Sequence, residues 1–219
     1  MSHAIRIHSY GGPDVMQWEP HDPGEPGRGE ALIRQTAVGL NFIDVYERTG
    51  LYPNALPSGL GREGAGVVEA VGPGVRGLAA GERVAYVSSQ AGSYAQRRCM
   101  AADRLVTIPD GVSDRLAAAA MLKGLTAQFL LRRTHRVSKG DVVVIHAAAG
   151  GVGLIAAQWA RHLGATVIGV VGSEAKAEFA RGHGCHHTLI LGRDDLPAMV
   201  RELTGGKGAN VVYDSIGKD

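Results

Sequence analysis

A strand, a glycine-rich turn, a helix and a second strand follow one another in the second half of the chain. This order constrains the fold more than any other feature. The apolar run at residues 142–145 predicts a strand buried on both faces of a parallel sheet. Apolar residues at 154–163 recur at helical spacing, and Gly164 predicts the end of that helix. The β-branched run at 166–171 predicts the second strand. Together they predict a βαβ unit, whose glycine turn suits the pyrophosphate of a dinucleotide.

The glycines of the turn have separate predicted tasks. Gly150 lets the backbone approach the phosphates, and Gly153 lets the helix pack closely on the strand. Ala148 stands where the general G-x-G-x-x-G pattern has its first glycine, so the turn departs from that form. A glycine turn alone also fits an ordinary tight turn. Placed inside a complete βαβ unit, it favours cofactor binding.

The end of the second predicted strand favours NADPH over NADH. NAD sites usually place Asp or Glu there to bind the ribose 2′-OH. Here Gly172 and Ser173 leave room for a 2′-phosphate, and Lys176 supplies a positive charge. Alternatively, Ser173 only caps the next helix and Lys176 is a surface lysine. Glu174 argues against a phosphate site.

Composition excludes several classes of protein. Apolar content of 45%, charged content of 20% and 32 glycines in 219 residues describe a soluble, turn-rich α/β or mixed protein. The net charge is +2 and the Lys and Arg residues are scattered, so neither a nucleic-acid nor a membrane surface is expected. The distant Cys99 and Cys185 form no metal-ligand pair and favour a reduced, cytoplasmic protein. The first residues alternate like a strand rather than a signal peptide, and no run is long enough to span a bilayer.

Residues 1–112 predict a separate, β-rich domain. Short strands divided by Gly/Pro turns are typical of a small, partly open β-barrel, with one helix at 42–49. The predicted fold class is therefore this β-barrel followed by an α/β domain, a partial doubly wound parallel sheet in residues 113–219. The boundary is expected between Asp110 and Leu122, where Ser113 caps a helical stretch. The predicted strands of the first domain are 4–8, 30–38, 66–71, 83–87, 94–100 and 105–108.

Residues 113–219 predict the first half of a doubly wound sheet and the start of the second half. In the strand order 3-2-1-4-5-6 the last two strands are missing. The strand near residues 211–213 would then be an exposed apolar edge, so we expect a truncated chain, or a partner that covers the edge. Besides the βαβ unit, the predicted elements are helical stretches at 116–122 and 126–133, a turn at 138–141, helices at 177–181 and 196–203, and strands at 187–191 and 210–215.

Seven sequence blocks match one known family in the right order. They are residues 11–13, 38–46, 50–53, 64–68, 123–127, 146–153 and 212–217. In these blocks the chain resembles the zinc-independent NADPH:quinone oxidoreductases of the medium-chain dehydrogenase/reductase superfamily, above all the ζ-crystallin-like branch. The resemblance implies a GroES-like catalytic domain joined to an incomplete Rossmann domain, with NADPH in the cleft between them and a quinone as acceptor. Full-length members continue past residue 219 and are homodimers.

The resemblance also implies chemistry without a metal ion. Zinc alcohol dehydrogenases of the superfamily bind zinc through a Cys and a His at positions that match Asn41 and Arg62 here. Asn is a poor zinc ligand and Arg is none. By family analogy Asn41, Tyr46 and Tyr52 line the cleft as catalytic candidates, whereas Asp44 positions its neighbours. Without the family, Asn41 is interpreted as a helix cap and the tyrosines as surface aromatics.

Further cofactor contacts are implied by the same resemblance. Lys123 and Thr126 lie at the domain junction, and Gly151 and Val152 offer backbone N–H groups. Leu191 replaces an aromatic residue that packs near the adenosine in the bacterial relatives, while Arg193 offers a phosphate contact. The predicted cofactor-binding residues are Asn41, Lys123, Thr126, Gly150, Gly151, Val152, Gly153, Gly172, Ser173, Lys176 and Arg193.

The predicted function is transfer of reducing equivalents from NADPH to a quinone without metal. Two alternatives remain open. One is an enone or alkene reductase of the same superfamily. The other is a catalytically silent, crystallin-like protein that binds NADPH without consuming it. Nucleic-acid binding is not expected, because no surface combining basic and aromatic residues is legible.

Overall fold

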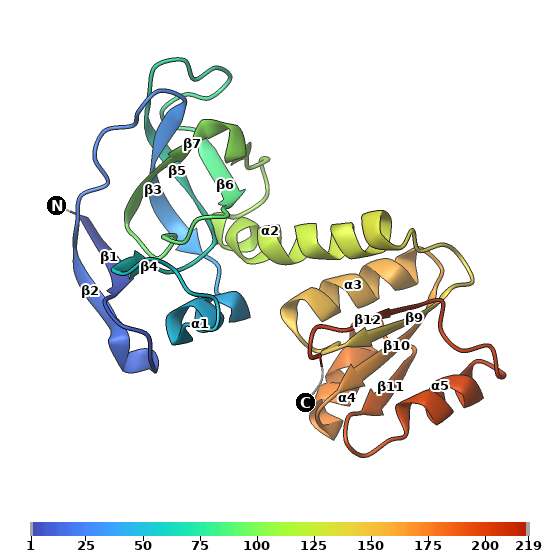
Figure 1. The fold of residues 1–219 in the computed structure, drawn as a ribbon. Coiled ribbons are helices and arrows are strands. Elements are labelled where there is room, and N and C mark those ends of the chain that lie inside the picture. The colour runs from blue at the N-terminus through green and yellow to red at the C-terminus, as the bar shows by residue number, and fades with distance from the viewer. Residues whose placement is uncertain (1, 218–219) are drawn as a thin grey trace. The chain divides into compact units, whose positions relative to one another are not determined.

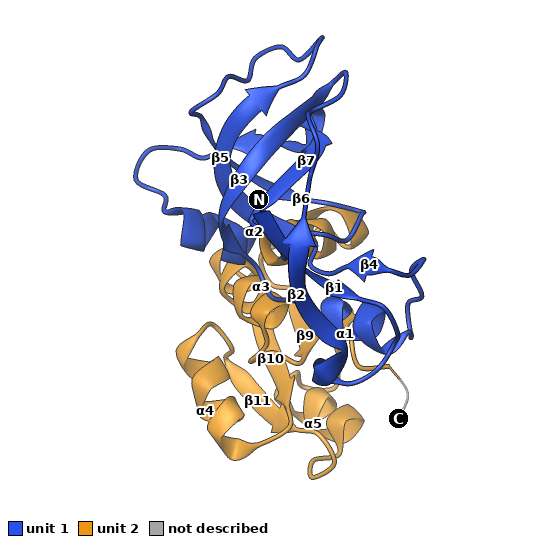
Figure 2. Ribbon diagram, turned by 90° about the vertical axis from the view of Figure 1, so that its left-hand side faces the viewer, with its two compact units in different colours: residues 1–122 blue, residues 123–219 orange. Residues whose placement is uncertain are grey.

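The computed structural model describes residues 2–217, and the chain divides into two compact units after Leu122 (Figure 2). Unit 1 comprises residues 1–122 and unit 2 comprises residues 123–219. Helix α2, Asp114–Phe129, runs across this division. The boundary predicted at residue 112 lies just before that helix begins. Each unit has its own sheets and its own buried core.

Unit 1 is built from antiparallel strands and one short helix (Figure 1). A three-stranded sheet has the order β2-β1-β4 and a five-stranded sheet the order β7-β3-β5-β6-β8. A bridge between Ala4 and Ala95 joins β1 to the segment before β7. The elements are β1 Ser2–Ile7, β2 Met16–His21, β3 Glu30–Val38, α1 Phe42–Thr49, β4 Ser58–Gly59, β5 Glu63–Val71, β6 Arg83–Val87, β7 Arg97–Ala101 and β8 Val106–Thr107.

The β-rich character predicted for the first part of the chain is confirmed, but two strands were missed. Strand β2 contains Pro20, and its residues are exposed or half-buried, so it lacks the alternation that marks a strand in sequence. Strand β4 has two residues only. Both are edge strands of the small sheet. Their register is fixed by pairing with β1, which no local pattern records.

Unit 2 is a parallel sheet of four strands in the order β11-β10-β9-β12 (Figure 1). This order confirms the predicted arrangement 3-2-1-4 of a doubly wound sheet. The elements are β9 Val142–His146, α3 Gly151–His162, β10 Thr166–Val171, α4 Glu174–Gly182, β11 His187–Ile190, α5 Leu196–Leu203 and β12 Val211–Tyr213.

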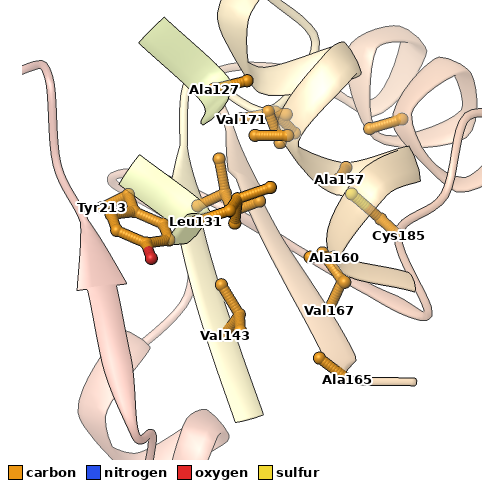
Figure 3. Packing of buried hydrophobic residues seen from close by; sticks show 14 of the residues in the cluster. Ala127, Leu131, Val143, Ala157, Ala160, Ala165, Val167, Val171, Cys185 and Tyr213 are labelled. Carbon is orange, nitrogen blue, oxygen red and sulfur yellow. The ribbon is translucent and has the colours of Figure 1, made fainter. Parts of the chain in front are cut away.

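The central strands of unit 2 are buried on both faces, as their continuous apolar runs predict. On one face Val143 and Val167 pack with Ala157 and Ala160 of α3 (Figure 3). On the other face Val144, Ile168, Val170 and Leu189 pack against side chains of α5. Alanines on α3 let the helix lie close to the strands.

Helix α2 corrects the prediction of two helical stretches. It is one helix that continues into a π-helical turn, Leu130–Thr134. Gly124 does not interrupt it, because glycine in a helix costs only roughly 1 kcal/mol relative to alanine. Burial of Ala127 and Leu131 in the unit 2 core outweighs that cost (Figure 3). With 16 residues, α2 is the longest helix described, and no helix within residues 2–217 is long and apolar enough to cross a membrane.

Leu131→Ala should lower the free energy of unfolding by about 2–5 kcal/mol, because Leu131 is fully buried and its loss leaves a cavity. Leu125→Ala is the matched control, since Leu125 is 52% exposed on α2. It should change stability by less than about 1 kcal/mol. Urea unfolding followed by circular dichroism measures both. Equal losses in the two variants would contradict this placement of Leu131.

Candidate functional site

The turn between β9 and α3 presents backbone N–H groups at the carboxyl edge of the sheet. Gly150 is extended and is the N-cap of α3, and its N–H donates to the Ala147 carbonyl oxygen at 2.8 Å. Ala147 has a left-handed φ of 49°, which is unusual for a residue with a side chain. No acidic residue lies in the first turn of α3. The N–H groups that follow, including those of Gly151 and Val152, are therefore suited to an anion.

The close approach predicted at Gly153 is present. A Cβ atom there would lie 2.4 Å from the Ala147 oxygen and 2.7 Å from Cα of Ala148. At Gly151 a Cβ atom would lie 2.7 Å from Cδ of Lys123, so the aliphatic stem of this lysine crosses the first turn of α3. Thr126 follows Lys123 by almost one turn on α2. The fold thus brings predicted cofactor residues from α2 and α3 together.

The end of β10 is open, as a 2′-phosphate pocket requires. A Cβ atom on Gly172 would meet nothing within 4 Å. The Ser173 hydroxyl accepts a hydrogen bond from the Lys176 backbone N–H at 3.4 Å, so Ser173 does cap α4. Lys176 is exposed in the first turn of that helix. Because β9 and β10 are adjacent and parallel, this end lies at the same sheet edge as the glycine turn.

Arg193, predicted as a phosphate contact, is paired with carboxylates. Its guanidinium donates to Glu174 at 2.9 Å and to Asp194 at 2.8 Å. The hydrogen bond from Arg193, with a further contact from Arg181, holds the pKa of Glu174 below its usual value. Glu174 is thus neutralised by arginines. Its charge therefore repels a phosphate beside Lys176 less than the sequence alone indicates.

Asn41 is the N-cap of helix α1 and is almost fully buried. Its backbone N–H donates to Oδ2 of Asp44 at 2.9 Å, and its side-chain amide donates to Oε1 of Glu63 at 2.8 Å. Oδ2 of Asp44 also accepts from the Tyr94 hydroxyl at 2.6 Å. Burial is the main cause that raises the pKa of Asp44 and of Tyr94 above their usual values. Asp44 therefore has the structural role predicted for it.

A buried charge network supports the same helix. Glu47 and Glu63 are both fully buried. Glu47 pairs with the Arg62 guanidinium, and Oε2 of Glu63 accepts the Leu122 N–H at 2.7 Å. Buried carboxylates are tolerated only when cations or donors compensate them. Among residues 2–217 no group of three or more His, Cys, Asp or Glu side chains is placed to hold a metal ion.

Next to Asn41 lies an aromatic cluster formed by the exposed Phe42 and Tyr52 and the half-buried Tyr46. The Phe42 and Tyr46 rings meet edge to face with centroids 5.1 Å apart, and Tyr46 and Tyr52 are 5.2 Å apart. The Tyr52 N–H donates to the Tyr46 carbonyl oxygen at 3.1 Å. Phe42 is 70% exposed and Tyr52 51%. The fold thus gathers the three predicted catalytic residues, Asn41 and the two tyrosines, in one region of unit 1.

Sequence reasoning missed the residues that hold Asn41 in place. Glu63 and Tyr94 reach it, directly or through Asp44, from β5 and from the loop before β7. A buried glutamate and a solvated one look alike in sequence. The one available signal is local: Glu63 directly follows Arg62, the position that matches the zinc-binding His of the zinc alcohol dehydrogenases.

Family comparisons assign one match to each unit. The alcohol dehydrogenase GroES-like domain matches residues 27–110, and the zinc-binding dehydrogenase family matches residues 151–219. A quinone oxidoreductase of Pseudomonas aeruginosa is 50% identical over 220 residues, which cover 100% of this chain and 68% of that protein. A 2-haloacrylate reductase of a Burkholderia species is 52% identical over 223 residues, covering 99% of this chain and 67% of that protein.

Solved structures agree with these matches. The crystal structure of Escherichia coli quinone oxidoreductase complexed with NADPH has a TM-score of 0.96 and 45% identity, and the match covers 99% of this chain and 67% of that one. The chain therefore spans about two thirds of the length of the relatives it matches. The predicted fold class, a GroES-like domain followed by a partial dinucleotide-binding sheet, is confirmed.

Gly153→Ala should destabilise the protein by roughly 1–3 kcal/mol, because backbone atoms of the turn block the added methyl group. Gly151→Ala is the matched change two residues earlier. Its methyl group meets only the flexible Lys123 side chain, and alanine gains about 0.5–1 kcal/mol over glycine in a helix. Thermal and urea unfolding should therefore separate the two variants. A Gly153→Ala protein as stable as Gly151→Ala would refute the close contact.

Proposed function

The chain belongs to the quinone oxidoreductases of the medium-chain dehydrogenase/reductase superfamily, and on that premise we propose that it transfers a hydride from NADPH to a quinone without a metal ion. The observation that carries the proposal is the aromatic cluster Phe42–Tyr46–Tyr52 beside the buried amide of Asn41. A flat, electron-poor ring stacks well on such a cluster.

The unit 2 sheet edge supports NADPH as the cofactor. The start of α3, held close to the sheet at Gly153, offers the backbone N–H groups of Gly151 and Val152 to a pyrophosphate, and the space at Gly172 admits a 2′-phosphate. Lys176 supplies the positive charge for that phosphate. A relative that is 45% identical binds NADPH in its crystal structure. Lys123, Thr126, Gly150 and Val152 complete the proposed site.

The charges around Asn41 support chemistry without a metal ion. The positions where zinc-containing members have a Cys and a His are Asn41 and Arg62 here. Arg62 is already committed to the buried Glu47, so a fixed guanidinium supplies the positive charge in this network. A metal ion beside it would meet electrostatic repulsion, and among residues 2–217 no three His, Cys, Asp or Glu side chains are grouped to hold one.

The chain's own residues would bind and orient the acceptor. NADPH supplies a hydride from the nicotinamide ring. As the quinone gains two electrons, negative charge develops on its oxygen, and a second amide N–H of Asn41 can donate to it while the first stays with Glu63. Tyr46 and Tyr52 hold the ring by stacking. One further proton completes the hydroquinone.

A second candidate function is reduction of an activated alkene. The 2-haloacrylate reductase is as similar to this chain as the quinone oxidoreductase is, at 52% and 50% identity. Both reactions deliver a hydride to an electron-poor carbon or ring. They differ in the acceptor, because a carboxylate-bearing alkene gains little from an aromatic platform, whereas a quinone stacks on it.

Lys176→Ala should weaken NADPH binding by roughly 10-fold to 100-fold, because a charge-assisted hydrogen bond to the 2′-phosphate is lost. NADH binding should be unchanged, since NADH has no phosphate there. Lys207→Ala is the control, an exposed lysine in a loop of the same unit, with the same change of net charge. Titration calorimetry measures the dissociation constants of NADPH and NADH for the wild-type chain and for both variants. Equal losses for NADPH and NADH would rule out the 2′-phosphate contact.

Consumption of NADPH, followed at its absorbance maximum, distinguishes the acceptors. We expect faster oxidation of NADPH with 1,4-benzoquinone than with 2-chloroacrylate. Tyr52→Ala, which removes the exposed ring, should lower the rate with the quinone. Faster oxidation with the haloacrylate would establish the second candidate instead. Tight NADPH binding with neither acceptor reduced would identify the silent, NADPH-binding alternative.

A further inference from the structure

The side-chain amide of Asn41 has two ends of opposite hydrogen-bonding character, and its neighbours decide which end faces the acceptor. An amide nitrogen donates and an amide oxygen accepts, so turning the group over exchanges a donor for an acceptor at the same place. The proposed function needs the nitrogen beside the quinone oxygen, because negative charge develops there. A residue that keeps the amide in this orientation would therefore act on the reaction without touching the acceptor.

Glu63, the first residue of β5, is fully buried and accepts hydrogen bonds at both oxygens of its side chain. Oε1 accepts from Nδ2 of Asn41 at 2.8 Å, and Oε2 accepts the backbone N–H of Leu122 at 2.7 Å. An ionised carboxylate is an acceptor at both oxygens, which matches these two donors. Glu63 therefore binds Asn41 as a carboxylate.

The carboxylate of Glu63 permits only one orientation of the Asn41 amide. Because a carboxylate accepts and never donates, the nitrogen end of the amide has to face it. The opposite orientation would bring the amide oxygen against a carboxylate oxygen, so two buried acceptors would meet without a hydrogen bond. With the nitrogen held by Glu63 through one N–H, the second N–H of the same nitrogen is left for the acceptor.

Backbone atoms enclose the carboxylate of Glu63 and keep it in place. A Cβ atom on Gly39 would collide with Oε1 of Glu63 and with the Ala118 carbonyl oxygen, so the missing side chain makes room for the carboxylate. The Gly39 N–H donates to the Glu63 carbonyl oxygen at 3.2 Å. Ala118 and Leu122 both lie on α2. Strand β5, helix α2 and the segment after β3 therefore fix Glu63 together.

We propose that Glu63 is a positioning residue for the hydride transfer: its carboxylate keeps the nitrogen of the Asn41 amide directed at the acceptor oxygen. The inference rests on the proposed function, since it assumes that Asn41 donates to the acceptor. A donor aimed at developing negative charge contributes roughly 100-fold to 1,000-fold to a rate. Because that charge exists mainly in the transition state, loss of the orientation lowers kcat more than it changes KM.

Glu63→Gln tests the orientation, because glutamine has nearly the shape of glutamate but ends in an amide. The Leu122 N–H requires an acceptor, so the glutamine oxygen should remain there and the glutamine nitrogen should face Asn41. Asn41 should then turn over to accept from it, which removes the donor from the acceptor. The kcat of NADPH oxidation with 1,4-benzoquinone should fall roughly 10-fold or more, with KM nearly unchanged.

Glu63→Asp separates positioning from a merely structural role. Aspartate is shorter and leaves a cavity, but it remains a carboxylate and cannot turn the Asn41 amide over. It should therefore keep more of kcat than Glu63→Gln, although it unfolds at a lower urea concentration. A merely structural Glu63 predicts the reverse order of kcat. Glu69→Gln is the matched control on β5, partly exposed and with the same change of charge, and should keep the wild-type kcat.

NMR of the chain with ¹⁵N-labelled asparagine gives a readout that requires no turnover. In the wild-type chain, the Asn41 side-chain proton bound to Glu63 should resonate downfield of the side-chain protons of the exposed Asn210, because its hydrogen bond is charge-assisted. This shift should be lost in Glu63→Gln and kept in Glu69→Gln. If Glu63→Gln does not fold, the wild-type spectrum still decides. Asn41 protons at the positions of those of Asn210 would overturn the proposal.

The kinetic outcomes distinguish this proposal from the proposed function. A wild-type kcat in Glu63→Gln, or a smaller loss there than in Glu63→Asp, would overturn the proposal while quinone reduction by the wild-type chain upholds the proposed function. An equal rise of KM without a fall of kcat would also overturn it. A folded wild-type chain that binds NADPH but reduces no quinone would overturn both.

Discussion

Helix α3 contacts the end of β9 through backbone atoms at Gly153, and the proposed cofactor site depends on that contact. A Cβ atom there would lie 2.4 Å from the Ala147 carbonyl oxygen, so the helix can start over the sheet edge only because a side chain is missing. The contact also accompanies the left-handed backbone of Ala147, which costs roughly 1–2 kcal/mol. With α3 in this place, the end of β10 brings Lys176 to the same edge.

In unit 1 the corresponding constraint is electrostatic. Two fully buried glutamates, Glu47 and Glu63, require compensation, and Arg62 and the Asn41 amide provide it. The Asn41 side chain is therefore held by a buried hydrogen bond to Glu63. The rings of Phe42 and Tyr46 follow it on α1. Helix α1 thus carries both the buried charge of Glu47 and the exposed ring of Phe42.

Local sequence patterns predicted most of the elements. The elements that they missed or divided depend on contacts with distant residues. The runs at Glu30–Val38 and Thr166–Val171 have strong periodicity or continuous apolar character, and their bounds agree with the structure. Strand β2 has neither, and pairing with β1 alone makes it a strand. Helix α2 was predicted as two stretches, 116–122 and 126–133, whereas burial of Ala127 in the unit 2 core accompanies one continuous helix that includes Gly124.

The sequence by itself determined the βαβ unit, the glycine turn and the open end of β10 with Lys176, because each depends on residues close together in the chain. Only the tertiary structure decided that Glu63 accepts hydrogen bonds from both Asn41 and Leu122. These contacts join residues far apart in sequence, and their strength depends on burial, which a sequence does not record. The hydrogen bond from Arg193 to Glu174 also depends on the tertiary structure, which brings α4 and the end of β11 together.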